Sequence, residues 1–119
     1  MMHKDLLLGI DVGTTGTKCS VYDFHGKRVA SAYREYPMLH PRPGWTEQDP
    51  SRWWDAVCCN LQTIFQSQDI DKNRIAAVGT SSTNAVFLAD RQGQPLCNAI
   101  SLHDQRSGPQ VEWLKENIS

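Results

Sequence analysis

The first third of the chain alternates short apolar runs with turn residues, a pattern typical of β-strands. The apolar run Leu6–Val12 predicts a buried strand, and Lys18–Phe24 alternates apolar and polar residues as a second strand would. A turn at His25-Gly26 leads into a third run, Lys27–Tyr36. Because short turns join the three runs, we predict an antiparallel meander.

A proline-rich loop and then a helix follow. The segment Pro37–Pro50 contains four prolines, and since proline has no N–H to donate to a sheet, we predict an ordered surface loop. Asp49 is a good N-cap, and Pro50 suits the first helical position. The predicted helix carries apolar residues at the spacing of one buried face: Trp54, Val57, Cys58, Leu61, Ile64 and Phe65.

The last third predicts three more strands and a second helix. Arg74–Thr80 is a short apolar run, and because a helix precedes it, this strand must run parallel to its neighbour. Val86–Ala89 and Leu96–Leu102 predict two further short strands, and Ser107 or Gly108 starts a helix. These elements predict an α/β fold with a mixed sheet. No C-cap signal ends the second helix, so we expect the sequence to be a piece of a longer chain.

Composition excludes several classes of function. With 119 residues and a net charge of −1, the chain has the length of one small domain and no electrostatic basis for binding nucleic acid or an anionic membrane. No apolar run approaches the roughly 20 residues of a membrane-spanning helix. The four cysteines include no C-x-x-C pair, which argues against a zinc site. We expect four reduced thiols in a cytoplasmic protein, with no preference among oligomeric states.

The turn between the first two predicted strands has the composition of a phosphate site. Residues 11–18 read Asp-Val-Gly-Thr-Thr-Gly-Thr-Lys. Gly13 and Gly16 lack a Cβ, so the backbone can bend sharply and a ligand can come close. Exposed N–H groups and hydroxyls in such a turn form a concavity for anions, and Asp11 beside it can hold a hydrated Mg²⁺.

The spacing of this turn excludes the better-known glycine loops. Two residues separate Gly13 from Gly16, whereas a P-loop requires four, and the Gly-x-Gly-x-x-Gly pattern is absent. The segment that follows is a predicted strand rather than a helix. An ordinary hairpin with Asp11 at the surface is the alternative, but such a hairpin would not usually need Thr-Thr-Gly-Thr, so we favour a phosphate site between two strands.

The sequence resembles the FGGY family of carbohydrate kinases, within the superfamily of actin-like proteins, sugar kinases and heat-shock ATPases. Four stretches carry the resemblance: residues 9–18, 22–27, 40–50 and 98–106. The first is shared widely across the superfamily. The third, His-Pro-Arg-Pro-Gly-Trp-Thr-Glu-Gln-Asp-Pro, is similar to FGGY kinases in particular. The resemblance covers nearly the whole chain in the family's order.

The resemblance implies a fold, a function and a location for the catalytic groups. The fold would be a ribonuclease-H-like (actin-like ATPase) mixed sheet with flanking helices, with residues 1–119 forming the N-terminal part of the first of two domains. The function would be ATP-dependent phosphorylation of a sugar or polyol hydroxyl, with a pentulose or related polyol favoured. The general base and most nucleotide contacts would lie beyond Ser119, so we expect the isolated 119 residues to be inactive.

The resemblance also assigns residues to the nucleotide. Asp11 corresponds to the carboxylate that organises Mg²⁺ near the β- and γ-phosphates of ATP. Thr14 and Thr15 correspond to phosphate ligands, and Lys18 to a basic residue near the phosphates. The full set of candidates for the nucleotide and metal is Asp11, Gly13, Thr14, Thr15, Gly16 and Lys18. Phosphoryl transfer needs such metal and donor groups more than covalent help from the protein.

The sugar-binding candidates follow the fourth predicted strand and lie near residue 105. The family's glycerol kinases show Gln-Arg-Glu and its xylulose kinases Gln-Met-His where this chain has Thr83-Asn84-Ala85, which matches neither. Thr83 and Asn84 can still hydrogen-bond a polyol, although a polar loop end is the alternative. Asp104 and Arg106 lie in a stretch similar to the family's Trp-Asn-Asp-x-Arg, and they could contact a sugar hydroxyl or pair with each other.

Two other functions remain open at this stage. One is a non-kinase actin-like ATPase, which would not need the stretch around Trp45. The other is a catalytically inactive or truncated module that binds a sugar or phosphate, which the altered Thr83-Asn84-Ala85 keeps open. Trp45 itself is expected to anchor its loop rather than to cap a substrate cleft.

Overall fold

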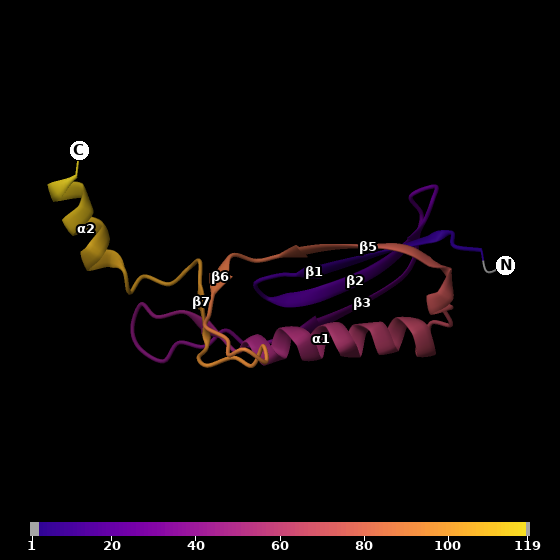
Figure 1. The fold of residues 1–119 in the computed structure, drawn as a ribbon, viewed down its shortest axis with the longest axis horizontal. Coiled ribbons are helices and arrows are strands. Elements are labelled where there is room, and N and C mark those ends of the chain that lie inside the picture. The colour runs from indigo at the N-terminus through magenta and orange to yellow at the C-terminus, as the bar shows by residue number, and fades with distance from the viewer. Residues whose placement is uncertain (1–2, 119) are drawn as a thin grey trace. The chain divides into compact units, whose positions relative to one another are not determined.

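The structure, a computed structural model, describes residues 3–118. These residues divide into two compact units (Figure 1). Unit 1 contains the residues up to Tyr36 together with Ser51–Thr83. Unit 2 contains Pro37–Pro50 and the residues from Asn84 onward.

Unit 1 is built on a four-stranded mixed sheet. Its strands are β1 (Leu6–Val12), β2 (Gly16–Asp23), β3 (Arg28–Glu35) and β5 (Ile75–Ser82), in the order β3-β2-β1-β5. The pairs β1–β2 and β2–β3 are antiparallel, whereas β1 and β5 are parallel. The structure therefore confirms the predicted meander and the predicted parallel strand.

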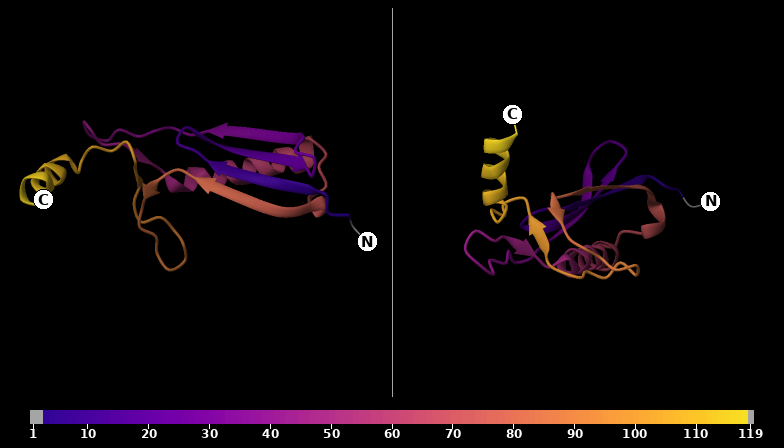
Figure 2. Two further views of the ribbon diagram at one scale, coloured as in Figure 1. Left: turned by 90° about the horizontal axis from the view of Figure 1, so that it is seen from above. Right: turned by 60° about the vertical axis from the view of Figure 1, so that its left-hand side comes forward.

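One face of this sheet is covered by helix α1 (Pro50–Gln62), which continues as a π-helical turn at Thr63–Ser67. Both views of Figure 2 show the helix running along the sheet. The core between them is a cluster of buried side chains: Leu6, Leu8, Cys19, Val21, Ala30 and Ile64. Each large apolar side chain buried there contributes about 1.5–3 kcal/mol relative to exposure.

The buried stripe of α1 confirms most of the predicted one, because Val57 and Ile64 are buried and Leu61 and Phe65 pack against the core. Trp54, predicted to face the core, is 69% exposed. Asn60, which was not predicted, is buried, and its side chain donates a hydrogen bond of 2.9 Å to the Thr17 carbonyl of β2. The buried face of the helix therefore includes an amide, to which a hydrophobic pattern gives no weight.

Unit 2 contains a small antiparallel sheet and a second helix. Strands β4 (Glu47–Gln48), β6 (Ala85–Val86) and β7 (Ala99–Ser101) pair in the order β4-β7-β6. Helix α2 (Gly108–Asn117) has Ser107 at its N-cap position, where the second helix was predicted to start.

Two strand predictions in unit 2 were too long and one strand was missed. The predicted strands Val86–Ala89 and Leu96–Leu102 overlap the observed strands only at Val86 and at Ala99–Ser101, and Asp90 closes a turn between them. Its carboxylate accepts hydrogen bonds from the Gln92 and Gln94 amides at 2.9 and 2.8 Å. Strand β4 lies in the segment predicted to be loop, since its partner β7 is about fifty residues away in sequence.

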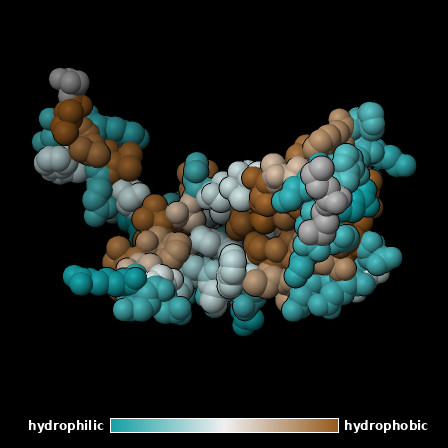
Figure 3. All heavy atoms as spheres, turned by 45° about the vertical axis from the view of Figure 1, so that its right-hand side comes forward, coloured by the Kyte–Doolittle hydropathy of each residue, from teal (hydrophilic) through white to brown (hydrophobic). Residues whose placement is uncertain are grey.

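Hydrophobic side chains are exposed in both units, and Figure 3 shows brown atoms at the surface. In unit 1, Leu7 on the sheet face opposite α1 is 39% exposed, and Val78 on the edge strand β5 is 56% exposed. None of the helices within residues 3–118 is long and apolar enough to cross a membrane. The four cysteines are free, and Cys19 is the buried one among them.

Candidate functional site

The turn between β1 and β2 is narrow, and its glycines are required by close packing. The Gly13 amide donates to the Gly16 carbonyl at 2.9 Å. A Cβ on Gly16 would lie 2.5 Å from the Tyr33 hydroxyl and 2.6 Å from the Arg34 carbonyl, and a Cβ on Gly13 would lie 2.9 Å from the Gly16 carbonyl. Neither glycine has a positive φ. A left-handed conformation is therefore not why glycine is needed at these two positions, since the limit is the space for a Cβ.

Asp11 lies at the end of β1 between two polar neighbours. The strand register pairs it with Lys18 on β2 and with Ser81 on β5. The Ser81 hydroxyl donates to Asp11 Oδ1 at 2.7 Å, and the carboxylate is exposed. Asp11, Lys18 and Ser81 line a hollow of about 430 Å³ on the sheet surface. The structure thus brings the predicted metal-binding carboxylate and the predicted basic residue to one place.

The two threonines of the turn contact different partners within unit 1. The Thr14 and Thr83 hydroxyl oxygens lie 3.1 Å apart, and the Thr83 amide donates to the Val12 carbonyl at 2.7 Å. The Thr15 hydroxyl lies 3.2 Å from the Tyr33 hydroxyl. One predicted sugar residue, Thr83, is therefore within hydrogen-bond distance of a predicted phosphate residue, Thr14.

In unit 2, Asp104 and Arg106 pair with each other, which was one of the two interpretations left open by the sequence. Arg106 Nε donates to Asp104 Oδ1 at 2.8 Å, and Arg106 Nη2 donates to Glu47 Oε1 at 2.7 Å. The Thr46 amide also donates to the Asp104 carboxylate at 2.6 Å. Sequence reasoning missed Glu47 as a partner, although it lies in the stretch that carries the family resemblance.

This ion-pair network perturbs the ionisation of its members. Hydrogen bonding by Arg106 holds the pKa of Asp104 well below its usual range and also lowers the pKa of Glu47. The carboxylate of Asp104, and then that of Glu47, raise the pKa of Arg106. Asp104 and Arg106 line a hollow of about 660 Å³ together with Asn84, so three of the four predicted sugar residues share one surface depression.

Trp45 holds the proline loop against the segment around residue 105. Two guanidinium groups lie over its ring, with Arg42 at 4.9 Å and Arg106 at 3.8 Å from the ring centroid. Such stacking attracts a cation to the negative face of the ring. The Gln105 amide donates to the Gly44 carbonyl at 2.8 Å, which fastens the same two segments. Trp45 therefore acts as a loop anchor, through cations rather than through the hydrophobic core.

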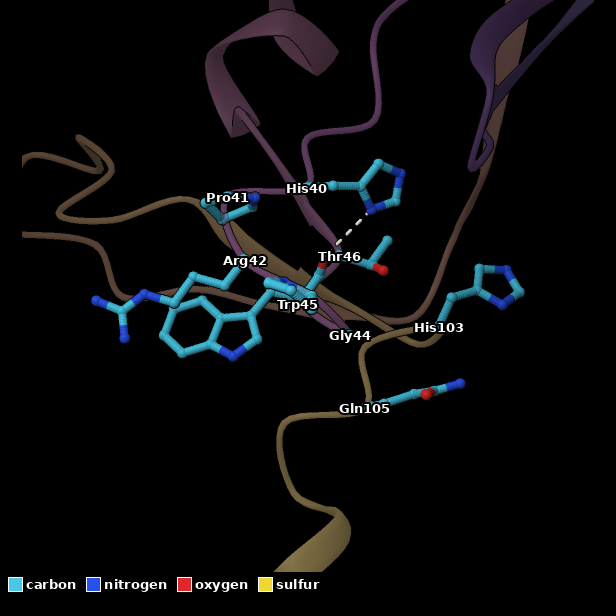
Figure 4. A pocket seen from close by; sticks show the side chains of 9 residues that line it. His40, Pro41, Arg42, Gly44, Trp45, Thr46, His103 and Gln105 are labelled. Atoms are coloured by element: carbon cyan, nitrogen blue, oxygen red, sulfur yellow. Dashed lines mark hydrogen bonds between the residues drawn. The ribbon is translucent and has the colours of Figure 1, made fainter.

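Behind this anchor, polar side chains border a hollow of about 500 Å³. Figure 4 shows the side chains of His40, Thr46, His103 and Gln105 extending to the side opposite Arg42 and Trp45. His40 Nδ1 lies 3.0 Å from the Trp45 carbonyl oxygen. Because a carbonyl only accepts hydrogen bonds, Nδ1 carries the proton in this contact.

Comparison with known proteins identifies relatives of the chain. The FGGY family of carbohydrate kinases, N-terminal domain, matches residues 6–119. A glycerol kinase of Haloferax volcanii is 37% identical over 108 residues, which cover 89% of this chain and 21% of that protein. The chain spans about a fifth of the length of the curated relatives it matches.

Among solved structures, the chain is likewise similar to carbohydrate kinases. A xylulose kinase from Rhodospirillum rubrum matches with a TM-score of 0.86 and 29% identity, over 96% of this chain and 24% of that one. A Plasmodium falciparum glycerol kinase with ADP matches with a TM-score of 0.85 and 25% identity, over 98% of this chain and 24% of that one. These likenesses confirm the actin-like, ribonuclease-H-like fold expected from the sequence. The chain belongs to the FGGY family of carbohydrate kinases.

Proposed function

We propose that this chain supplies the phosphate-binding turn of an ATP-dependent kinase that phosphorylates a hydroxyl of a sugar or polyol, with a pentulose or related polyol as the favoured substrate. The observation that carries the proposal is the contact between Thr14 of the turn and Thr83 at the end of β5. It brings a candidate phosphate ligand and a candidate sugar ligand together within one unit. Membership of a carbohydrate-kinase family argues against the alternative of a non-kinase ATPase.

The donor set around Asp11 fits a hydrated magnesium ion. Mg²⁺ prefers oxygen ligands and is usually held by one or two carboxylates, with phosphates and water completing its shell. Asp11 offers an exposed carboxylate whose orientation Ser81 fixes. No group of three or more His, Cys, Asp or Glu side chains lies close enough together in residues 3–118 to form a metal cage. Bound magnesium would neutralise charge on the β- and γ-phosphates.

Each turn residue has a role in this proposal. Asp11 holds the metal, Thr14 and Thr15 donate hydroxyl hydrogen bonds to phosphate oxygens, and Lys18 adds a positive charge at the same level of the sheet. Gly13 and Gly16 keep the turn narrow, which lets a phosphate approach the backbone. ADP in a related glycerol kinase supports ATP as the phosphoryl donor.

The sugar would be bound by Thr83, Asn84, Asp104 and Arg106. Thr83 and Asn84 follow β5 directly and offer a hydroxyl and an amide to a polyol. The Arg106 side chain is 24% exposed and that of Asp104 only 3%. Arg106 therefore has the surface to donate to a sugar hydroxyl, and Asp104 acts mainly by orienting Arg106.

The other groups that the reaction needs are proposed to lie in other parts of a full-length kinase. The general base and most nucleotide contacts belong, by resemblance to the family, to later parts of a full-length kinase. We therefore propose that residues 1–119 form the N-terminal part of the kinase's first domain and do not turn over substrate alone. The four free thiols support a cytoplasmic location for the whole enzyme.

Titration of the ¹⁵N-labelled 119-residue chain with ATP and magnesium tests the proposal. We expect shift changes at the amides of Gly13 and Gly16, and we expect them to disappear when Asp11→Asn is introduced. Asp69→Asn is the matched control, because Asp69 is exposed and the same loss of charge there touches none of the turn. Absence of shifts at the turn, or equal shifts in Asp11→Asn, would overturn the phosphate role.

A further inference from the structure

A buried tyrosine supports the phosphate turn from inside the protein. Tyr36 follows β3 and is only 9% exposed. Its hydroxyl donates a hydrogen bond of 2.5 Å to the Gly13 carbonyl, and its amide donates to the Thr15 carbonyl at 3.2 Å. Tyr36 therefore holds two carbonyls of the turn, although no motif in the sequence singled it out.

The tyrosine hydroxyl is itself fixed by a chain of hydrogen bonds that begins on helix α1. The Asn60 side chain donates to the Thr17 carbonyl at 2.9 Å, and the Thr17 hydroxyl donates to Tyr36 Oη at 3.3 Å. Thr17 and Asn60 are both buried. Since buried polar groups are costly to leave unpaired, these contacts resist rearrangement of the turn.

Ionisation does not interrupt this chain of contacts. Burial raises the pKa of the Tyr36 hydroxyl above its ordinary value, so the hydroxyl stays protonated at neutral pH. A protonated hydroxyl can donate to the Gly13 carbonyl while it accepts from Thr17. The direction of both hydrogen bonds is thereby settled.

Because a peptide group is planar, the hydrogen bond to the Gly13 carbonyl also fixes the direction of the Thr14 N–H. In a planar trans peptide the N–H points opposite to the C=O, and no peptide bond in residues 3–118 is cis. Because Tyr36 holds the Gly13 carbonyl on its own side, the amide of Thr14 in the same peptide group faces the opposite side. An N–H with a fixed direction is the kind of donor that binds phosphate in a turn.

We propose that Tyr36 is a positioning residue for phosphate binding, which fixes the Gly13–Thr14 peptide group through its hydroxyl. The inference rests on the proposed function and adds a residue that touches neither nucleotide nor metal. Thr17 acts indirectly, because its hydroxyl orients the Tyr36 hydroxyl.

The test compares Tyr36→Phe with the unmutated 119-residue chain. This variant keeps the ring and removes only the hydroxyl. Amide hydrogen exchange at Gly13, whose N–H is bonded to Gly16, is expected to rise about threefold to tenfold, the factor that corresponds to one hydrogen bond. Affinity for magnesium and ATP, from the same ¹⁵N titration, is expected to fall by a similar factor, while exchange at core amides such as Val21 stays unchanged.

Two further variants separate positioning from stability. Thr17→Val, which removes the hydroxyl that donates to Tyr36, is expected to change Gly13 exchange and affinity in the same direction by a smaller factor. Ile64→Val trims a fully buried side chain of the core and touches none of the turn. It is expected to lower the melting temperature while leaving Gly13 exchange and nucleotide affinity as they were.

Three results would overturn the inference. Equal rises in exchange at Gly13 and Val21 in Tyr36→Phe would make the role purely structural. Faster exchange at Gly13 with unchanged nucleotide affinity would show that the supported turn does not bind phosphate. If the unmutated chain shows no binding of ATP with magnesium, the proposed function fails and the positioning role fails with it, whereas the exchange rates still report whether Tyr36 supports the turn.

Discussion

The Ser81 hydroxyl donates a hydrogen bond of 2.7 Å to the Asp11 carboxylate, across the parallel pair β1 and β5. The contact joins residues 70 positions apart in sequence. It orients the carboxylate that lies beside the turn proposed to bind phosphate. Groups that hydrogen-bond to a metal-binding side chain generally orient that side chain. We therefore expect the Asp11 carboxylate, proposed to bind magnesium, to lose less rotational freedom when the metal binds.

Asp11→Asn tests the role of this carboxylate in a full-length kinase that contains the chain. We expect turnover to fall by about 10² or more, the scale of losing one charge-stabilising group in a reaction site, with little change in the KM for sugar. Ser81→Ala should lower the affinity for magnesium by about tenfold, because it only frees the rotamer. Steady-state kinetics with varied ATP, magnesium and sugar measures both. Asp69→Asn is the control, and a main effect on the KM for sugar would contradict the assignment.

Gly16→Ala tests the packing of the turn. The added Cβ meets both the Tyr33 hydroxyl and the Arg34 carbonyl, and the backbone carbonyl cannot move aside as a flexible side chain could. We expect the free energy of unfolding to fall by about 1–3 kcal/mol. Gly79→Ala is the matched control on β5, where a Cβ has no neighbour within 4 Å, and we expect a change within about 0.5 kcal/mol. Urea unfolding of both variants gives the comparison, and equal losses would refute the steric argument.

The network of Asp104, Glu47 and Arg106 predicts a pH dependence of stability. The folded state lowers the pKa of both carboxyl groups, with Arg106 as the main cause. Their contribution is therefore complete above the unfolded pKa values of about 4 and is lost as the pH falls through the lower folded values. Asp104→Asn should reduce the free energy of unfolding at pH 7, and the difference from the unmutated chain should shrink below about pH 4.

Urea unfolding at pH 7 and pH 3 measures this effect. Asp5→Asn provides a comparison, because Asp5 forms an exposed pair with Arg74 and its pKa is also lowered, mainly by that arginine. Solvent screening makes its contribution the smaller of the two. A difference between Asp104→Asn and the unmutated chain that is the same at both pH values would contradict the prediction.

Catalysis by the isolated chain is predicted to be absent. By resemblance to the family, the general base and most nucleotide contacts are proposed to lie in later parts of a full-length kinase. We expect no production of ADP above background when the chain is mixed with magnesium, ATP and a pentulose such as xylulose. A coupled assay for ADP measures this, with a complete glycerol or xylulose kinase as the positive control. Sustained turnover would mean that the chain contains its own base.

Local signals in the sequence predicted much of unit 1. Glycines, short turns and alternating residues predicted β1, β2 and β3, and the Asp49-Pro50 pair located the start of α1. The predicted buried face of α1 is confirmed at Val57, Leu61, Ile64 and Phe65 but was wrong at Trp54, which is exposed. Asn60 was missed because hydrophobic periodicity gives no weight to a buried amide. Strand β4 was missed because its pairing depends on residues far away in sequence.

The candidate site was located from the sequence more readily than it was explained. The turn at residues 13–16 was identified from its composition, but the steric need for its glycines was missed, since a Cβ there would meet the Tyr33 hydroxyl and neighbouring carbonyls. The close approach of a ligand to these glycines stays a prediction. Tyr36 could not be found, because its contact with Gly13 depends on the register that pairs Gly16 with Glu35. The ion pair of Asp104 with Arg106 needed their distance, and a sugar contact by these two residues stays a prediction.

The parallel pairing of β1 with β5 also bears on the order in which the chain folds. The hairpin of β1 and β2 joins neighbours in sequence, so it can form early, as local contacts do. The pairing along the other edge of β1 can form only after Ile75–Ser82 have been synthesised. These residues form the last strand of this sheet to leave the ribosome. We therefore expect a nascent chain to form the turn first and to gain the hydroxyl that fixes Asp11 only when synthesis has passed Ser81.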